Sequence, residues 1–285
     1  MFPEIEIGQL AIRTWDICLV LSYIVVVSLL LVNRPKDYLL TRLQLFTFTI
    51  IFFFVGLIGA GLLNILINIG EYSKMTPEEL CSNVGSAYFG ALILGLLGVW
   101  IFFREIGKPF LQAIDYIAPY LMLERVIGRI GCLLAGCCSG VKTNLPWGFD
   151  FSGCGFIVHP TQAYEMSYAF GIFISGIYFY QKFRDCKGIS FFYVIFMYSF
   201  FRFFNEFLRE EGPFITDTFK LVHPFLILLA VFSLFSIVTR LRSYPARKNL
   251  EIGRSIFVAL AILLSGVAIC LLISLPIISI IAKNN

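Results

Sequence analysis

Two arginines, Arg129 and Arg202, carry the clearest chemical signal in this 285-residue sequence, because each lies in a long apolar stretch. An arginine inside a membrane is costly unless it faces protein, water or an anion. Arg125 precedes Arg129 by four residues, which places both on one helix face. Both could snorkel to the lipid headgroups, but Gly128 and Gly131 leave backbone open for close approach beside Arg129. Two guanidinium groups from different helices could together hold a phosphate through bidentate hydrogen bonds.

Arg202 belongs to a polar stripe on an otherwise aromatic segment. The stripe consists of Tyr198, Arg202, Glu206 and Arg209, which recur at positions i, i+4, i+8 and i+11 of one helix face. In lipid, such a stripe has to face the interior of a helix bundle or an aqueous cavity. The alternative is a purely structural Arg202–Glu206 pair, which contributes only about 0.2–0.5 kcal/mol on an exposed helix.

A third polar cluster is the run His159-Pro-Thr-Gln-Ala-Tyr-Glu165. Proline and threonine at a helix start are ordinary capping residues, and His159 could also serve only as a cap. His159, Gln162, Tyr164 and Glu165 together are more than a cap requires. We therefore expect the three polar clusters, which lie on three different apolar segments, to converge at one end of the molecule, at the outer leaflet of the membrane.

The cysteines near these clusters leave several interpretations open. Cys132, Cys137, Cys138 and Cys154 are all predicted to fall on the outward side, with His159 near. Their spacing fits no standard pair-and-pair zinc pattern, and adjacent cysteines are awkward ligands for one tetrahedral centre. Disulfides in an oxidising compartment and buried packing are alternatives. A dithiol redox enzyme is less favoured, because adjacent cysteines form a disulfide only with strain. The sequence thus predicts no metal.

The elements that position these residues are apolar spans. The chain is 59% hydrophobic and 14% charged, with a mean hydropathy of +0.86, which is far from the composition of soluble domains. Runs near the ~20 residues needed to cross a bilayer recur along the chain, and they lack the alternation of barrel strands. We predict an all-α, polytopic helical membrane protein with seven to eight transmembrane helices. The predicted spans are Trp15–Val32, Leu45–Ile69, Ser86–Phe103, Phe110–Ala135, Thr161–Tyr180, Ile189–Phe204, Leu221–Val238 and Ile256–Ile281.

The distribution of basic residues predicts the orientation of these spans. Lysine and arginine concentrate in every second loop, at 33–44, 104–109 and 181–188, and in the connector before the last span. The positive-inside rule places these loops in the cytoplasm and the amino terminus outside. The net charge of +4 then reflects topology and anionic lipid rather than nucleic acid.

The same topology predicts how the chain is divided. Residues 1–240 form the transmembrane core, which includes an outward-facing loop at 136–160. Residues 241–285 form a basic cytoplasmic connector and an additional carboxyl-terminal span. A lipid transporter or scramblase-like protein is an alternative function, but the inverted repeats typical of transporters are not evident in the sequence.

At these residues the chain resembles the prolipoprotein diacylglyceryl transferase family, over roughly residues 1–238. The resemblance rests on the amino-terminal stretch, on Gly128-Arg129-Ile-Gly131 with Gly140, on the run from His159 to Glu165, and on the stripe from Tyr198 to Arg209. The chain departs from the family pattern in several places. Cys132 replaces an asparagine, Cys137 replaces a glutamate, and Phe89 stands where the family carries histidine or tyrosine. The resemblance therefore indicates a divergent member.

The resemblance implies transfer of a diacylglyceryl group from phosphatidylglycerol to the lipobox cysteine of a prolipoprotein signal peptide, at the outer leaflet of the bacterial inner membrane. It implies no metal and no organic cofactor. A relative that acts on another acceptor is an alternative. The catalytic residues implied are Arg129, Arg202, Glu206, Tyr198 and His159. The implied residues that bind phosphatidylglycerol are Arg129, Arg202, Gly128, Gly131, Gly140, Gln162, Tyr164, Glu165 and Arg209.

Overall fold

The computed structural model describes residues 4–7, 10–67, 69–72, 88–151, 155–210, 215–216, 219–242, 253 and 255–268. The chain forms two compact units. One unit comprises Met1–Ser28 together with Ile114–Asn285, and the other comprises Leu29–Ala113. Each unit is described by itself below.

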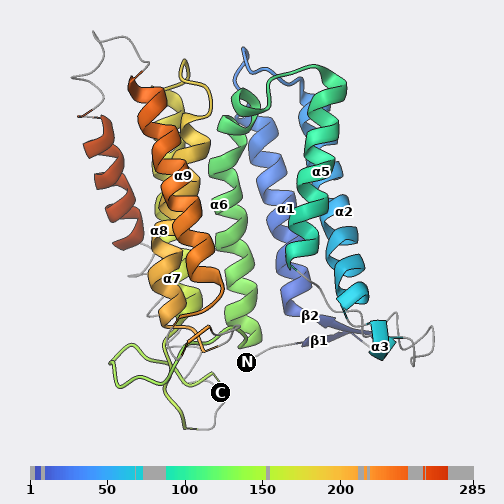
Figure 1. The fold of residues 1–285 in the computed structure, drawn as a ribbon. Coiled ribbons are helices and arrows are strands. Elements are labelled where there is room, and N and C mark those ends of the chain that lie inside the picture. Colours follow the sequence, from blue (N-terminus) through green and yellow to red (C-terminus); the bar gives the residue numbers. More distant parts are fainter. Residues whose placement is uncertain are drawn as a thin grey trace. The chain divides into compact units, whose positions relative to one another are not determined.

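Helices dominate both units, which confirms the all-α prediction (Figure 1). The long apolar helices identify a polytopic membrane protein, and α1, α2 and α9 are each long and apolar enough to cross a bilayer. The observed elements are β1 (Glu4–Ile7), β2 (Leu10–Arg13), α1 (Thr14–Val32), α2 (Arg42–Ile67), α3 (Ile69–Tyr72), α5 (Tyr88–Ile106), α6 (Phe110–Ala135), α7 (Thr161–Lys182), α8 (Ile189–Phe207) and α9 (Val222–Arg242), followed by a further helix at Ser255–Ala268.

The helix boundaries agree closely with the predicted spans. Helix α6 coincides with the predicted span, and α7 and α8 begin at the predicted residues. Residues 269–281 of the last predicted span lie outside the described residues. The number of membrane crossings, the outside location of the amino terminus and the division of the chain at residue 240 remain predictions.

The smaller unit is built on the packing of α2 against α5. A Cβ added to Gly98 of α5 would lie 3.2 Å from Val55 Cγ1 of α2, so the glycine lets the two backbones approach closely. Aromatic rings fill the next layer, where Phe48 packs on Phe102 and Phe103. This packing follows from small and aromatic residues on facing helices, because apolar helices in lipid associate through close packing rather than through the hydrophobic effect.

The core of the larger unit lies around α7. Buried residues of α6, α7, α8 and the helix at Ser255–Ala268 form one cluster that includes Ala169, Ile172 and Leu263. Gly171 allows the last described helix to approach α7 closely, because a Cβ on Gly171 would lie 2.6 Å from Leu263 O. Residues after 240 therefore contribute directly to this core.

Backbone contacts join the loop after α6 to the ends of two helices. Gly140 pairs with Arg209 just after α8, Gly140 N donates to His159 O at 2.9 Å, and Val141 N donates to Leu208 O at 2.8 Å. The end of α6, the start of α7 and the end of α8 consequently meet at one end of this unit (Figure 1). This is the convergence that the three polar clusters predicted.

Candidate active site

The centre of the site is the carboxylate of Glu165, which is completely buried on α7. Three side chains from two other helices contact it closely. Arg202 Nη1 lies 2.7 Å and Arg129 Nη2 lies 2.8 Å from Glu165 Oε2, and Tyr198 Oη donates to Oε1 at 3.0 Å. Arg125 Nε is farther away, at 3.5 Å. The carboxylate thus fixes the buried guanidinium group of Arg129 on α6 beside the partly buried one of Arg202 on α8.

A second buried carboxylate, that of Glu206, holds the other side of the arginine cluster. Arg202 Nη2 lies 2.6 Å from Glu206 Oε2, and Arg209 Nε lies 3.9 Å from the same oxygen. Lys220 Nζ lies 3.5 Å from Glu206 Oε1 and donates to Arg209 O at 2.6 Å. Arg202 is therefore shared between two carboxylates, which restrains its guanidinium plane. The pair is buried rather than exposed, unlike the purely structural alternative.

The start of α7 explains why Glu165 lies where it does. The helix begins after Pro160, which has no side-chain capping hydrogen bond, and a proline at a helix start is compatible with the unpaired amides there. Glu165 lies one turn further along, where it meets Arg129 of α6 and Arg202 of α8. His159 is therefore not the cap of this helix.

Side chains at the start of α7 anchor the loop that follows α6. Thr161 Oγ1 donates to Cys138 O at 2.8 Å, and Gln162 Nε2 donates to Cys137 O at 2.5 Å. Asn205 Nδ2 of α8 donates to Thr161 O at 3.3 Å. Both Thr161 and Gln162 are 1% exposed. The loop backbone at the two cysteines is thus tied to the same helix that carries Glu165.

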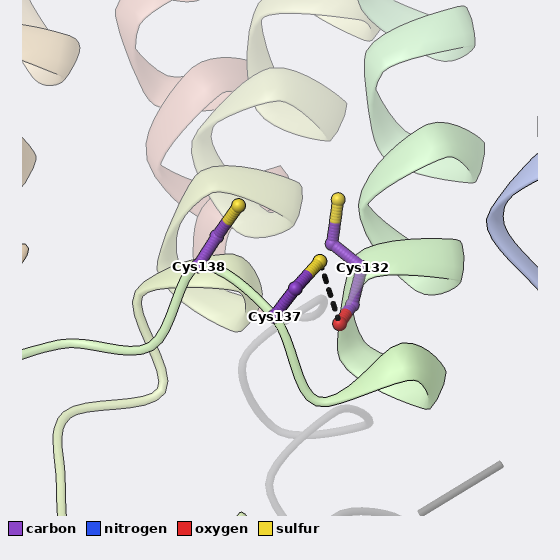
Figure 2. Close-up of side chains that lie close together, drawn as sticks. All are labelled: Cys132, Cys137 and Cys138. Carbon is purple, nitrogen blue, oxygen red and sulfur yellow. Dashed lines mark hydrogen bonds between the residues drawn. The ribbon is translucent and has the colours of Figure 1, made fainter. Parts of the chain in front are cut away.

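Three thiols gather beside the arginine cluster. Their Sγ atoms, in Cys132, Cys137 and Cys138, all lie within 4.8 Å of one another (Figure 2). Arg129 Nη1 lies 3.7 Å from Cys132 Sγ, so one arginine contacts both this thiol and Glu165. Hydrogen bonds from the other two thiols lower the pKa of Cys138, assisted by the charges of Arg209 and Arg129. Cys154 lies outside the described residues.

His159 lies in the loop and contacts a different group of residues. Its Nδ1 lies 3.2 Å from Tyr164 Oη, and that oxygen also accepts a hydrogen bond from Trp147 Nε1 at 2.9 Å. Partial burial lowers the pKa of His159. Within the described part of the chain, no hydrogen bond or ion pair joins His159 or Tyr164 to Glu165.

The three glycines of the predicted site differ in their surroundings. A Cβ on Gly140 would lie 2.5 Å from Leu208 O and 2.7 Å from His159 Cβ, so only glycine fits where the three segments meet. A Cβ on Gly131 would lie 2.8 Å from Cys18 Cβ, which makes Gly131 a close contact between α6 and α1. A Cβ on Gly128 would lie 3.7 Å from Glu124 Oε1, which is an ordinary contact distance. Gly128 therefore does not mark a close approach of two segments.

The charges of the site do not cancel. Five cationic side chains, Arg125, Arg129, Arg202, Arg209 and Lys220, surround the carboxylates of Glu165 and Glu206, with Glu124 close by. In addition, the Nε atom of Arg129 is buried and has no hydrogen-bond partner among the described residues. A buried donor without a partner in a region of excess positive charge is suited to an anionic ligand.

Comparison with known proteins agrees with this geometry. The family model for prolipoprotein diacylglyceryl transferase matches residues 4–244. The chain belongs to the prolipoprotein diacylglyceryl transferase family. A phosphatidylglycerol–prolipoprotein diacylglyceryl transferase of Dehalococcoides mccartyi strain 195 is 29% identical over 86% of this chain and 95% of its own length. The enzyme of the same name from Clostridium tetani is 28% identical over 72% of this chain and 85% of its own length.

Within this family frame, the predicted residues fall into two groups. The first group is built on the two buried carboxylates, Glu165 and Glu206. The side chains that contact these carboxylates are Arg129, Arg202, Tyr198 and Arg209. The second group makes the contacts that hold the loop after α6, and it consists of Gly140, His159, Gln162 and Tyr164. The side chain of Phe89, for which the resemblance implied a departure from the family pattern, lies outside the described residues.

Sequence reasoning missed Lys220, Thr161 and Asn205. Lys220 is 1% exposed although it lies just before α9, and a lone lysine at a span end is ordinarily taken as a snorkelling residue. The one available signal was its position at the end of a span that is predicted to face outward, as is the end of the span that carries the polar stripe. Thr161 and Asn205 act through backbone carbonyls, which leave no mark on the pattern of side chains.

Proposed function

We propose that this protein transfers a diacylglyceryl group from phosphatidylglycerol to the cysteine thiol of a prolipoprotein lipobox, which forms a thioether and releases glycerol 1-phosphate. Membership of the family supports the reaction class. The observation that carries the proposal is the pair of guanidinium groups, that of buried Arg129 and that of partly buried Arg202, fixed on the single carboxylate of Glu165.

The reaction is attack of sulfur on a carbon whose leaving group is a phosphate ester. It requires a thiolate, stabilisation of the charge that grows on the departing phosphate, and alignment of two membrane-bound reactants. Arg129 and Arg202 meet the second requirement. The buried Nε of Arg129, which has no partner among the described residues, can donate to a phosphate oxygen without giving up the bond to Glu165.

Glu165 and Glu206 are positioning residues in this mechanism. A carboxylate neutralised by two guanidinium groups is a weak base, so Glu165 orients Arg129 and Arg202 rather than accepting the thiol proton. Glu206 fixes the second guanidinium edge of Arg202 at 2.6 Å. Tyr198 donates to Glu165 and offers a hydroxyl beside the reacting groups.

The expected setting is the bacterial cytoplasmic membrane, with the site facing the outer leaflet. The basic loops at 33–44, 104–109 and 181–188 support this orientation through the positive-inside rule. The partners are then phosphatidylglycerol and the signal peptide of a prolipoprotein, both of which reach the site from the bilayer. His159 is proposed to position the loop after α6 through Tyr164.

The test is transfer by the purified protein in phosphatidylglycerol liposomes. A lipobox peptide is expected to gain the mass of one diacylglyceryl group on its cysteine, with one glycerol 1-phosphate released for each peptide labelled. The same peptide with serine in place of cysteine serves as the control. Release of glycerol 1-phosphate without peptide labelling would indicate another acceptor, and absence of both products would refute the proposal.

A further inference from the structure

The three thiols beside Arg129 form a compact group. Cys132 is buried at the end of α6, and Cys137 and Cys138 follow in the loop. All three are free thiols in the described structure. Figure 2 shows their side chains converging on the space between the end of α6 and the loop.

The backbone at Cys138 makes this convergence possible. Its φ of 61° is the only positive value of a non-glycine residue in the described part of the chain. Such a conformation is uncommon outside glycine, asparagine and aspartate, and it persists where the surroundings hold it in place, often at functional sites. The buried side chains of Thr161 and Gln162 hold it here through the carbonyls of Cys138 and Cys137. Adjacent cysteines, which the sequence alone disfavoured as ligands of one centre, therefore face a common point.

We propose that Cys132, Cys137 and Cys138 bind one zinc ion whose fourth coordination position receives the thiol of the acceptor peptide. This inference rests on the proposed transferase function. Zinc binds thiolates at about 2.3 Å, and catalytic zinc sites keep three protein ligands and one open position. Tetrahedral geometry at that bond length separates the sulfurs by roughly 3.8 Å, which is within the 4.8 Å limit of the observed group.

The charge of the surroundings suits this site. Three thiolates and one divalent cation carry a net charge of −1, and Arg129 Nη1 lies 3.7 Å from Cys132 Sγ. The same guanidinium contacts Glu165 through Nη2. A thiolate bound at the open position would thus lie next to the arginine proposed to hold the phosphate, as a displacement reaction requires.

The proposed step balances as follows. The acceptor thiol binds zinc and releases its proton to solvent, because a coordinated thiol is deprotonated. A sulfur lone pair then attacks the glyceryl carbon that bears the phosphate ester. The carbon–oxygen bond breaks, its electron pair stays on the phosphate oxygen, and the released glycerol 1-phosphate takes up one proton. No oxidant or reductant is involved.

Metal analysis of the full-length protein tests the site independently of activity. Protein purified without chelator is expected to contain one zinc ion per chain, and cobalt substitution is expected to give thiolate-to-cobalt charge-transfer absorption. The variant Cys137→Ser with Cys138→Ser should lose both signals, while the matched variant Cys186→Ala, which alters a buried thiol of the core cluster, should keep them. Zinc-free wild-type protein, copper in place of zinc, or a disulfide among the three cysteines would overturn the inference.

Turnover separates this inference from the proposed function. A free cysteine with a pKa near 8.5 is only about 3% ionised at pH 7, so removal of zinc by a chelator should slow peptide labelling by roughly 30-fold, and added Zn²⁺ should restore it. Labelling that continues unchanged without metal would refute the role of zinc in activating the acceptor thiol and leave the transferase function standing. Bound zinc with no labelling in any metal state would refute the transferase function, and with it the catalytic role of the ion.

Discussion

Replacement of Glu165 by glutamine is the perturbation that best examines the architecture of the site. The substitution keeps the volume of the side chain and removes one buried negative charge. Arg202 retains a second carboxylate, because its Nη2 lies 2.6 Å from Glu206. Arg129 has its close ion pair with Glu165, at 2.8 Å, and is only 8% exposed. The loss of stability in Glu165→Gln should therefore arise mainly from Arg129, whose buried charge would lose its partner.

Removal of one partner from a buried ion pair typically costs about 3–5 kcal/mol, since the remaining charge is left buried without compensation. At roughly 2–4 °C for each kcal/mol, the thermal midpoint of Glu165→Gln should fall by on the order of 10 °C. Arg125→Gln is the matched control. Arg125 lies 3.5 Å from the same carboxylate, and its side chain is 31% exposed, so its loss should cost about 0–1 kcal/mol.

Thermal unfolding in detergent, followed by tryptophan fluorescence, provides the measurement. A double-mutant cycle adds the decisive comparison. Arg129→Gln should restore part of the stability that Glu165→Gln removes, by about 1–3 kcal/mol, whereas Arg202→Gln should restore less because it also takes a partner from Glu206. A midpoint for Glu165→Gln within about 2 °C of wild type would refute the reasoning, as would equal recovery by the two arginine variants.

Three further outcomes follow from the structure. Gly140→Ala should destabilise the protein by about 1–3 kcal/mol, because its Cβ would lie 2.5 Å from a carbonyl oxygen. Gly128→Ala should not, because its Cβ would meet only Glu124 Oε1, at an ordinary contact distance of 3.7 Å. Thermal midpoints check both variants, and equal midpoints would contradict the account. Burial lowers the pKa of His159, so the contribution of the neutral imidazole to stability is complete above about pH 6.5 and is lost as the pH falls through the folded pKa. The thermal midpoint of His159→Gln should therefore decline less on acidification than that of wild type. Parallel declines of the two midpoints would argue against this. Lys220→Met should reduce turnover by loosening Glu206 while the fold persists in circular dichroism, and unchanged turnover would exclude that positioning role.

Much of this site could be predicted from sequence because it is polar in an apolar background. The stripe from Tyr198 to Arg209 has one interpretation on a helix in lipid, namely a face turned toward protein or water. The confirmed helices follow from the same contrast, since in lipid long apolar runs of this kind form helices. The family membership, inferred from the same residues, is also confirmed.

The roles of Glu165 and of the cysteines could not be predicted in the same way. Nothing in the run from His159 to Glu165 shows that the glutamate, rather than the histidine, meets both arginines, because that depends on how far each lies along α7. The convergence of Cys137 and Cys138 depends on a positive φ at a non-glycine residue, and residue propensities predict against it. Backbone carbonyls anchored by Thr161 and Gln162 leave no sequence pattern at all.

The central claim is that Arg129 and Arg202 together hold the phosphate that departs from phosphatidylglycerol. The most direct measurement is single-turnover labelling of a lipobox peptide by wild type, Arg129→Gln and Arg202→Gln in the same liposomes, with Arg125→Gln as the control. Loss of one preorganised donor to a developing oxyanion typically slows the reaction by about 10²–10³-fold. The account predicts a loss of at least this size for Arg129→Gln and Arg202→Gln, in protein that remains folded and membrane-inserted, and a much smaller loss for Arg125→Gln. Wild-type labelling by a folded Arg129→Gln or Arg202→Gln variant would contradict it.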